Sequence, residues 1–408
     1  MTRVKTHLVG LSQNVIVEDT NTFAALEEEW EDLYRECPLA TPFQSWAWLY
    51  SWWESYGQRY ELRLVTIRNN EGLLVGIMPL MLERKRVLGR LLFIGSGPSD
   101  YLDVLAREGW EAEVVEAGIW ALERMGSWQV VDLHQLRPQA AAWGIFERWE
   151  GPKARVWQDN CPVIDAKPWD DLLMSFKRKT RYDVRRAIRR AESDGLRCEP
   201  AGPEDARQAA RTLVNLNREQ WKERGLDPEA LTPRFRSHLE AAARRMTSRG
   251  LGRISEFRRD GEVIASHFLV FGHSFVGEHL FGASQEALER YQISSLYIHD
   301  GINVALERNS AHLDLLRGEE PYKLRWASRV VANHRVVLGR GRVSWAPYAA
   351  YVALRLGAKR YAHSDSAPQW IKDTLPKVRS VRFRVRRYAN QESGSRWLKD
   401  AVNLLVKR

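Results

Sequence analysis

The feature of this sequence that most constrains its fold is an internal repeat. Two hairpin-like segments, residues 61–82 and 251–272, each contain an apolar-rich strand, a polar turn that closes on a glycine (Gly72 or Gly261) and a second strand. Each hairpin is preceded by two helical patterns and followed by a helix-length segment and a short strand. The alternative is chance similarity between α/β segments. Similarity over so many elements indicates two copies of one unit, and we expect each copy to form its own mixed sheet.

The second copy has the clearer pattern, with the order βααβββαβαβ. Its second helix begins at Thr232 and Pro233, an N-cap residue followed by proline at the first helical position. Apolar periodicity predicts the remaining elements. These are strands at about 251–258, 262–271 and 274–281, a helix at 294–307, a strand at 311–316, a short helix at 321–327 and a strand at 329–338.

Composition agrees with a globular chain of more than one domain. The 408 residues are 44% apolar and 28% charged, which excludes a mostly disordered chain. The repeat predicts domains at 14–165 and 166–340 and an extension at 341–408. The three cysteines are widely spaced without a CxxC pair, which favours a reducing, cytoplasmic setting. No apolar run has the length of a signal peptide or a membrane span.

Positive charge is concentrated at the C-terminal end. The formal net charge is +10, and residues 340–408 alone contain 16 Lys or Arg and 4 Asp or Glu, a net +12. Such a segment is either a solvated surface or a contact for anionic lipid or RNA. Residues 378–388 alternate basic and apolar positions, as a strand does. A second basic run, 177–190, follows a helical pattern.

Three strings carry a resemblance to known acyltransferases. They are TPFQSWAWLYSWWESYG (41–57), GSGPSDYLDVL (95–105) and DLLRGEEPYKLRWASR (314–329). With the element order, they resemble the CelD-like acyltransferases, a family linked to cellulose and exopolysaccharide production. The duplication resembles the FemAB-like arrangement. Over residues 14–340 the resemblance implies an α/β fold of two tandem GNAT-like domains with mixed sheets, followed by the basic C-terminal extension.

The resemblance also implies a reaction. A GNAT acyltransferase of this kind transfers an acyl group, expected to be acetyl, from acyl-CoA to an amine or hydroxyl of a sugar or envelope precursor. The usual glycine-containing pyrophosphate loop is absent after Phe281, so Ser294 and Ser295, at the start of a helix, are the candidate contacts for the pyrophosphate. No His, Cys, Asp or Glu cluster has metal-ligand spacing, and no metal is expected.

Two other functions remain open at this point. One is a FemAB-like peptidyl transferase that uses aminoacyl-tRNA, which the basic segments favour. The other is a non-catalytic accessory protein that binds a polysaccharide or a synthase, which the missing glycine loop favours. The expected location is cytoplasmic or peripheral to the inner face of the membrane, and the sequence does not indicate an oligomeric state.

Attack of an amine on a thioester needs a base, an N–H that polarises the carbonyl, and an acid for the thiolate. Glu278, in an apolar strand, is the candidate base; the alternative is a surface glutamate at a sheet edge. The resemblance places a general-acid tyrosine in a helix comparable to that of Tyr322, so Tyr322 is the candidate acid. The alternative is a tyrosine that only packs against its neighbours. Asp314 orients the acceptor amine or caps a turn. Lys323 is the candidate contact for a phosphate or for the acceptor's carboxylate.

The first copy offers candidate residues for acceptor binding. Asp100, Tyr101 and Asp103 lie in a loop rich in Gly, Pro and Ser, and such loops often carry binding residues. A helix cap is the alternative for Asp103. Trp46 begins a tryptophan-rich helical pattern, 46–53, whose rings form either core or a platform that stacks on a sugar.

Overall fold

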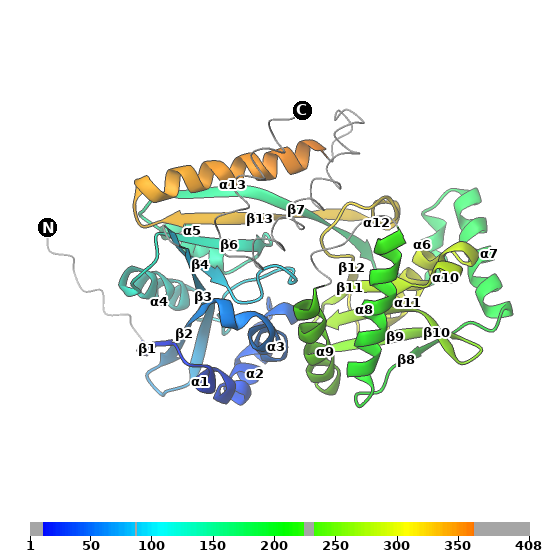
Figure 1. Cartoon of the computed structure of the whole chain (residues 1–408), viewed down its shortest axis with the longest axis horizontal. Coiled ribbons are helices and arrows are strands. Elements are labelled where there is room, and N and C mark those ends of the chain that lie inside the picture. The colour runs from blue at the N-terminus through cyan, green and yellow to red at the C-terminus, as the bar shows by residue number, and fades with distance from the viewer. Residues whose placement is uncertain (1–10, 86–87, 224–231, 363–408) are drawn as a thin grey trace, which may run out of the picture.

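The computed structural model describes residues 11–85, 88–223 and 232–362, which form a long mixed sheet covered by helices (Figure 1). The strand order is β1-β2-β3-β4-β6-β13-β7-β12-β11-β10-β9-β8, and β5 pairs with β3. The strands are β1 (Leu11–Val17), β2 (Glu61–Asn69), β3 (Leu74–Lys85), β4 (Leu88–Phe93), β5 (Leu105–Ala106), β6 (Val130–Leu136), β7 (Lys153–Asp165), β8 (Arg197–Pro200), β9 (Gly252–Arg259), β10 (Glu262–Phe271), β11 (Val276–Ala283), β12 (His312–Asp314) and β13 (Arg329–Gly339).

The helices occupy the connections between these strands. They are α1 (Thr20–Ala25), α2 (Glu27–Arg35), α3 (Trp46–Tyr56), α4 (Glu111–Arg124), α5 (Ala142–Arg148), α6 (Trp169–Met174), α7 (Arg178–Ser193), α8 (Ala206–Glu223), α9 (Pro233–Ser248), α10 (Gln285–Arg290), α11 (Ile293–Glu307), α12 (Pro321–Trp326) and α13 (Arg342–Ala362), with short 3-10 turns η1 (Pro42–Gln44) and η2 (Gly57–Arg59). Within the described ranges, none of them combines the length and the apolar character needed to cross a bilayer.

The two halves repeat one order of elements, as the paired hairpins predict. The series β2-β3-β4-α4-β6-α5-β7 corresponds to β9-β10-β11-α11-β12-α12-β13. In each half one pair of strands is parallel, β4 with β6 and β11 with β12. Gly72 and Gly261 have φ of +83° and +84°, the left-handed turn conformation that favours glycine. The predicted N-cap is also confirmed, since the Thr232 side chain accepts from the Phe235 amide.

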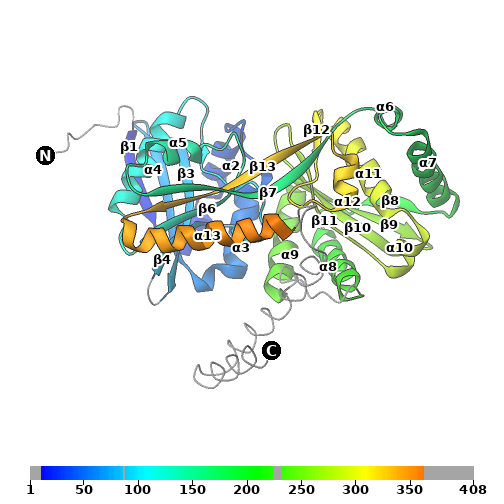
Figure 2. The same ribbon diagram turned by 90° about the horizontal axis from the view of Figure 1, so that it is seen from above.

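The expectation of a separate sheet for each half was wrong. The last strand of each half pairs with strands of the other half: β13 lies between β6 and β7, and β7 lies between β13 and β12. The long β7–β13 ribbon crosses the junction of the two halves (Figure 2). The boundary near residue 165 therefore divides the sequence but not the sheet, and the domain limits stay a prediction.

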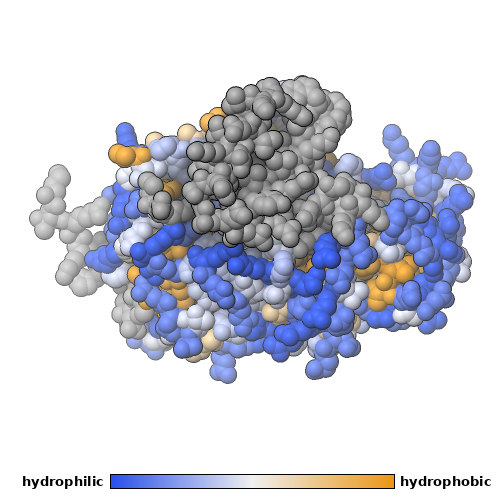
Figure 3. Space-filling view, in the orientation of Figure 1, coloured by the Kyte–Doolittle hydropathy of each residue, from blue (hydrophilic) through white to orange (hydrophobic). Residues whose placement is uncertain are grey.

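The first part of the basic extension is the helix α13, which lies along β13 and β7 (Figures 1 and 2). Its inner face packs Ala349, Val352 and Leu356 against Val130 and Val337. The strand predicted at 378–388 lies outside the described residues. The face of the molecule drawn in Figure 3 is mainly hydrophilic, with small apolar groups.

Candidate active site

The three strings that carry the family resemblance lie against one another at the junction of the halves. The Thr41 hydroxyl donates to the Tyr101 carbonyl at 3.0 Å, and the Trp48 indole N–H donates to the Ser99 hydroxyl at 2.7 Å. The Tyr101 hydroxyl in turn donates to Asp314 Oδ2 at 2.7 Å. The first string thus holds the loop formed by the second, and that loop reaches into the other half.

Tyr101 is held in a conformation that a free chain would avoid. Its φ is +51°, the left-handed region, which is uncommon for a bulky residue. Hydrogen bonds from η1 to the loop hold it there, including one from the Gln44 side-chain amide to the Val104 carbonyl at 3.4 Å. Phe275 packs edge-on against the Tyr101 ring. Such an outlier is typical of a functional site, because the surrounding structure must stabilise it.

Asp314 is the centre of a buried polar cluster from both halves. It is 8% exposed, its Oδ1 accepts from the Leu316 amide at 2.7 Å, and burial raises its pKa to about 6. Asp100 is also buried, which raises its pKa, and forms an ion pair with Arg317 at 3.1 Å. Asp100 and Tyr101 come from one string and Asp314 from another, and the structure brings them together.

Lys323 belongs to the same cluster. It is buried, and its ammonium donates to the Arg317 carbonyl at 2.9 Å and lies 3.4 Å from the Glu320 carboxylate. Its charge lowers the pKa of Asp314 against the larger effect of burial. A direct contact of Lys323 with a phosphate on the solvent side does not fit this buried position. The Lys323 ammonium instead balances the charge of the buried Asp100 and Asp314 carboxylates.

Glu278 belongs to a second buried cluster, so the alternative of a surface glutamate is excluded. It is 5% exposed, and His267 Nδ1 lies 2.8 Å from its Oε2. His267 Nε2 lies 2.8 Å from Asp300 Oδ2. Burial lowers the pKa of His267, but Glu278 and Asp300 outweigh burial and raise that pKa to about 9. At neutral pH an imidazolium therefore bridges two carboxylates. Burial also raises the pKa of Glu278.

His267 and Asp300 were not predicted from the sequence. Asp300 on α11 also accepts from Ser255 and Arg253, each at 2.8 Å, and the Tyr297 ring stacks on His267 with centroids 5.1 Å apart. One signal was available for both: each is a polar residue inside an otherwise apolar segment, IASHFLVF or LYIHDGINV. A buried polar residue needs a partner.

The backbone of β11 changes its pairing at Glu278. β11 pairs with β12 at Val276 and Gly277, and beyond that point the two strands diverge. On the other edge, the register with β10 shifts between Leu280 and Glu278, which leaves His279 as an extra residue, as in a β-bulge. A bulge leaves backbone groups outside the ladder. The corresponding β3–β4 ladder of the first half runs without a shift.

Tyr322 lies on α12, close to Glu278. Its hydroxyl is buried and has no hydrogen-bond partner among the residues that the structure describes. Burial raises its pKa, and the nearby Glu320 and Glu278 charges add to this effect. Its ring packs edge-on against Phe281 of β11. Tyr322 therefore lies near Glu278, whereas Asp314, the partner of Gly277 on β12, directs its carboxylate to the opposite face of the sheet, toward Tyr101.

Comparison with known proteins agrees with this geometry. Residues 178–324 match a family model described as Acetyltransferase (GNAT) domain, and this segment contains Glu278, His267, Asp300, Asp314 and Tyr322. The fold is a GNAT fold. No curated protein matches the chain.

Solved structures are similar over most of the chain. FemX aligns with a TM-score of 0.57 at 11% identity, over 80% of this chain and 97% of FemX. The C-terminal domain of a putative lysylphosphatidylglycerol synthetase from Agrobacterium fabrum aligns at 0.51 and 12%, over 82% and 96%. L-PGS from Bacillus licheniformis aligns at 0.51 and 13%, over 81% and 96%. At these identities the similarity shows the fold alone.

The expected pyrophosphate contacts of the second GNAT unit need correction. In place of a glycine loop, the short helix α10 follows β11, and α11 begins at Ile293. Ser294 is half-buried in its first turn, whereas Ser295 is fully buried with an unpartnered hydroxyl. A direct contact between the buried Ser295 side chain and a pyrophosphate does not fit this position, and the Ser295 amide donates to the Gln292 carbonyl at 2.9 Å, so Ser294 is the remaining candidate contact.

Two predicted acceptor-binding residues of the first GNAT unit have structural roles. The Asp103 carboxylate accepts from the Ala141 and Ala142 amides at 2.7 and 2.9 Å and caps α5. Trp46 is buried, donates to the Phe23 carbonyl and stacks on Tyr50 with centroids 4.5 Å apart. These contacts favour the structural alternatives, a core ring for Trp46 and a helix cap for Asp103, and their roles in acceptor binding stay predictions.

The residue of the first GNAT unit that corresponds to Asp314 is Asp132. Its carboxylate is fully engaged by neighbouring side chains. Arg335 donates to both carboxylate oxygens at 2.6 Å, and Tyr348 of α13 donates to Oδ2 at 2.5 Å. Burial raises the pKa of Asp132, but His134 and Arg335 outweigh it and hold that pKa well below its usual range. The helix α13 thus covers Asp132 in the first unit. The corresponding place in the second unit holds the buried acidic cluster around Asp314.

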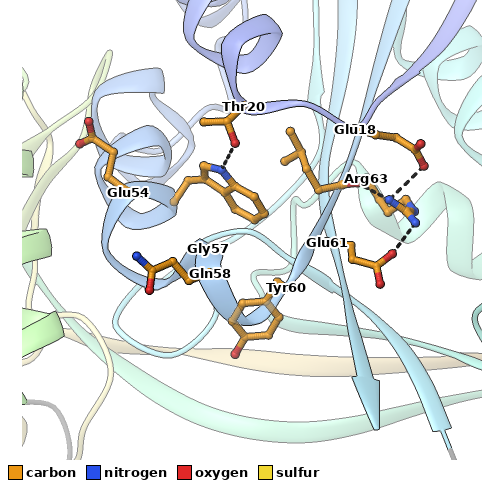
Figure 4. A pocket seen from close by; sticks show the side chains of 10 residues that line it. Glu18, Thr20, Glu54, Gly57, Gln58, Tyr60, Glu61 and Arg63 are labelled. Atoms are coloured by element: carbon orange, nitrogen blue, oxygen red, sulfur yellow. Dashed lines mark hydrogen bonds and ion pairs between the residues drawn. The ribbon is translucent and has the colours of Figure 1, made fainter.

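A separate pocket of about 600 Å³ lies between α3 and β2 (Figure 4). Its wall includes Tyr60, Gln58 and Trp53, whose indole N–H donates to Thr20 at 3.0 Å. Arg63 pairs with Glu18 and Glu61 at 2.9 and 2.7 Å along one side. None of the predicted site residues lines this pocket.

Proposed function

We propose that the second GNAT unit transfers an acyl group, expected to be acetyl, from acyl-CoA to an amine. The observation that carries this proposal is the buried Glu278 carboxylate, hydrogen-bonded to His267, at the residue where β11 separates from β12 and bulges away from β10. The strings similar to CelD-like acyltransferases support an amino sugar or an envelope precursor as the acceptor.

In the proposed reaction the amine nitrogen attacks the thioester carbonyl carbon. Glu278 takes the proton that the nitrogen loses, and a backbone N–H freed at the bulge stabilises the oxyanion. The C–S bond then breaks, and Tyr322 donates its proton to the leaving thiolate. His267 stays protonated throughout and positions the Glu278 carboxylate, because its pKa of about 9 lies above neutrality.

The Asp314 cluster suits the acceptor. Asp314 pairs with Gly277, the residue before Glu278, beside the opening where β11 and β12 diverge, and an ionised carboxylate there accepts hydrogen bonds from N–H or O–H groups of the acceptor. The Tyr101 hydroxyl orients the carboxylate and lowers its pKa against the effect of burial. The first unit would thus contribute a positioning residue to the active site of the second.

Calorimetric titration of the full chain with acetyl-CoA is the first test of this proposal. We expect saturable one-site binding, together with release of free thiol when a panel of amino sugars is added. A chain that binds no acyl-CoA would contradict the proposal.

Replacing Tyr101 by phenylalanine is expected to raise the KM for the acceptor about tenfold, because a hydrogen bond to a charged group contributes about 1.5–3 kcal/mol. The acceptor binds the ionised form of Asp314, so KM in the wild type falls as pH rises through about 6. In Tyr101→Phe this midpoint moves to higher pH. Tyr50→Phe, which alters a tyrosine stacked on Trp46, is the control. An unchanged midpoint would show that the Tyr101 hydroxyl has no effect on acceptor binding.

Tyr322→Phe is expected to lower turnover on the order of 100-fold or more, because the thiolate then leaves without a positioned proton donor. The affinity for acetyl-CoA, measured by calorimetry, stays unchanged, since the substitution removes one oxygen that has no described hydrogen-bond partner. Full turnover in this variant would mean that water or another residue protonates the thiolate.

A second candidate function is transfer of an aminoacyl group from aminoacyl-tRNA. The FemAB-like duplication in the sequence and the structural similarity to FemX support it. The same base would serve, because an amine also attacks an ester. Parallel assays with labelled acetyl-CoA and labelled aminoacyl-tRNA distinguish the two donors.

A further inference from the structure

The outer face of α13 carries an apolar stripe. Val343, Tyr351 and Leu354 are 91%, 53% and 75% exposed. At about 100° per residue they fall within roughly 80° of one another around the helix axis. Such large apolar side chains seldom gather on a solvated helix face, because exposing them to water is unfavourable.

The charge around this stripe has one sign. Residues 340–362 contain five Lys or Arg and no Asp or Glu. Arg355 is exposed about 40° from Tyr351 around the helix axis, and Arg342, which directly precedes Val343 in the chain, is exposed as well. Residues 363–408 add eleven basic and four acidic residues, so the chain that continues from this helix is basic as well.

The inner face of α13 fixes the helix to the protein. Ala349, Val352 and Leu356 pack on the sheet, Trp345 donates to the Val337 carbonyl at 3.0 Å, and Tyr348 donates to the buried Asp132. The exposed stripe is therefore a fixed part of the surface, with a set direction relative to β7 and β13.

We propose that the outer face of α13 binds the surface of an anionic lipid bilayer. A helix with aliphatic and aromatic residues on one face, flanked by arginines and without acidic residues, has the chemistry of an interfacial helix. The apolar residues enter the boundary of the acyl chains while the arginines pair with lipid phosphates. RNA would need the arginines but would gain nothing from Val343 and Leu354. This proposal does not depend on which acyl donor the protein uses.

The test is flotation of the full chain with two kinds of vesicle, phosphatidylcholine alone and an equal mixture of phosphatidylcholine and phosphatidylglycerol. We expect binding to the mixed vesicles only. Val343→Glu and Leu354→Glu should each lower the partition coefficient at least about tenfold, because a carboxylate replaces an inserted apolar group and is repelled by the lipid phosphates. Both positions are exposed, so thermal melting should stay unchanged.

Leu73→Glu, at an exposed position in the β2–β3 turn, is the matched control and should bind as the wild type does. Truncation after Ala362 separates the helix from the segment that follows it. If truncation abolishes binding while Leu354→Glu leaves it intact, the C-terminal segment binds lipid and the proposal is overturned. Binding to tRNA with no binding to mixed vesicles would overturn it as well.

Discussion

Replacing Glu278 by glutamine is expected to lower acyl-transfer turnover on the order of 100-fold or more, because glutamine keeps the shape of the side chain but cannot accept the proton of the amine. The affinity for acetyl-CoA should stay the same, since no charge next to the pyrophosphate changes. Thiol release measured at saturating acetyl-CoA and acceptor gives the turnover, and calorimetry gives the affinity.

The pH profile separates a catalytic role for Glu278 from a structural one. Burial raises the Glu278 pKa, so turnover in the wild type rises with pH as this carboxyl ionises. Turnover falls again above about 9, where His267 loses the proton that positions the base. Glu278→Gln should lose the rising limb. Glu256→Gln changes a buried, Arg258-paired glutamate of β9 and should keep both limbs. Near-full turnover in Glu278→Gln would require another base.

Replacing Asp132 by asparagine is expected to lower the free energy of unfolding by about 3–5 kcal/mol, the usual effect of removing one partner from a buried ion pair. Arg335 makes two hydrogen bonds to Asp132 and is itself nearly buried, so the substitution leaves its charge unpaired. Urea unfolding measures the change. Glu116→Gln, in an exposed pair with Arg148, is the control and should change stability by less than about 1 kcal/mol.

The pH dependence of stability follows from the same ion pair. The folded-state pKa of Asp132 lies below its unfolded value, so its contribution is complete above the unfolded pKa of about 3.9. The contribution disappears as pH falls through the folded-state pKa. Stability of Asp132→Asn should therefore depend less on pH in the acid range. An equal acid sensitivity in both proteins would show that Asp132 is not a major stabilising charge.

Much of the fold could be predicted because local patterns specify the elements. The strand 262–271 and the helix that follows Thr232 lie where the sequence places them. The exchange of β7 and β13 could not be predicted, because pairing between strands far apart in the chain depends on which sheet edges remain open. The open edge of each half-sheet can accept a strand with the same apolar alternation, so periodicity does not show which of the two edges β7 or β13 joins.

The candidate site was predicted in part for a related reason. Glu278 and Asp314 are acidic residues in apolar strands, and a buried acid is conspicuous in any sequence. His267 and Asp300 matter through their contact with Glu278, which joins β10, β11 and α11 and has no local signature. Two alternatives stayed open for Trp46 and for Asp103, because residue type alone does not show whether a ring or a carboxylate is accessible.

The exchanged strands have a consequence for how the chain folds during synthesis. The sheet of the first half needs β13 next to β6, and the ribosome makes β13 only after the whole second half. At 5–20 residues per second that delay is on the order of 10–40 seconds. During this time β6 and β7 expose unpaired edges, which attract other strands. The two halves therefore form one cooperative folding unit, completed only when β13 leaves the ribosome, and we expect neither half to be a stable product of proteolysis.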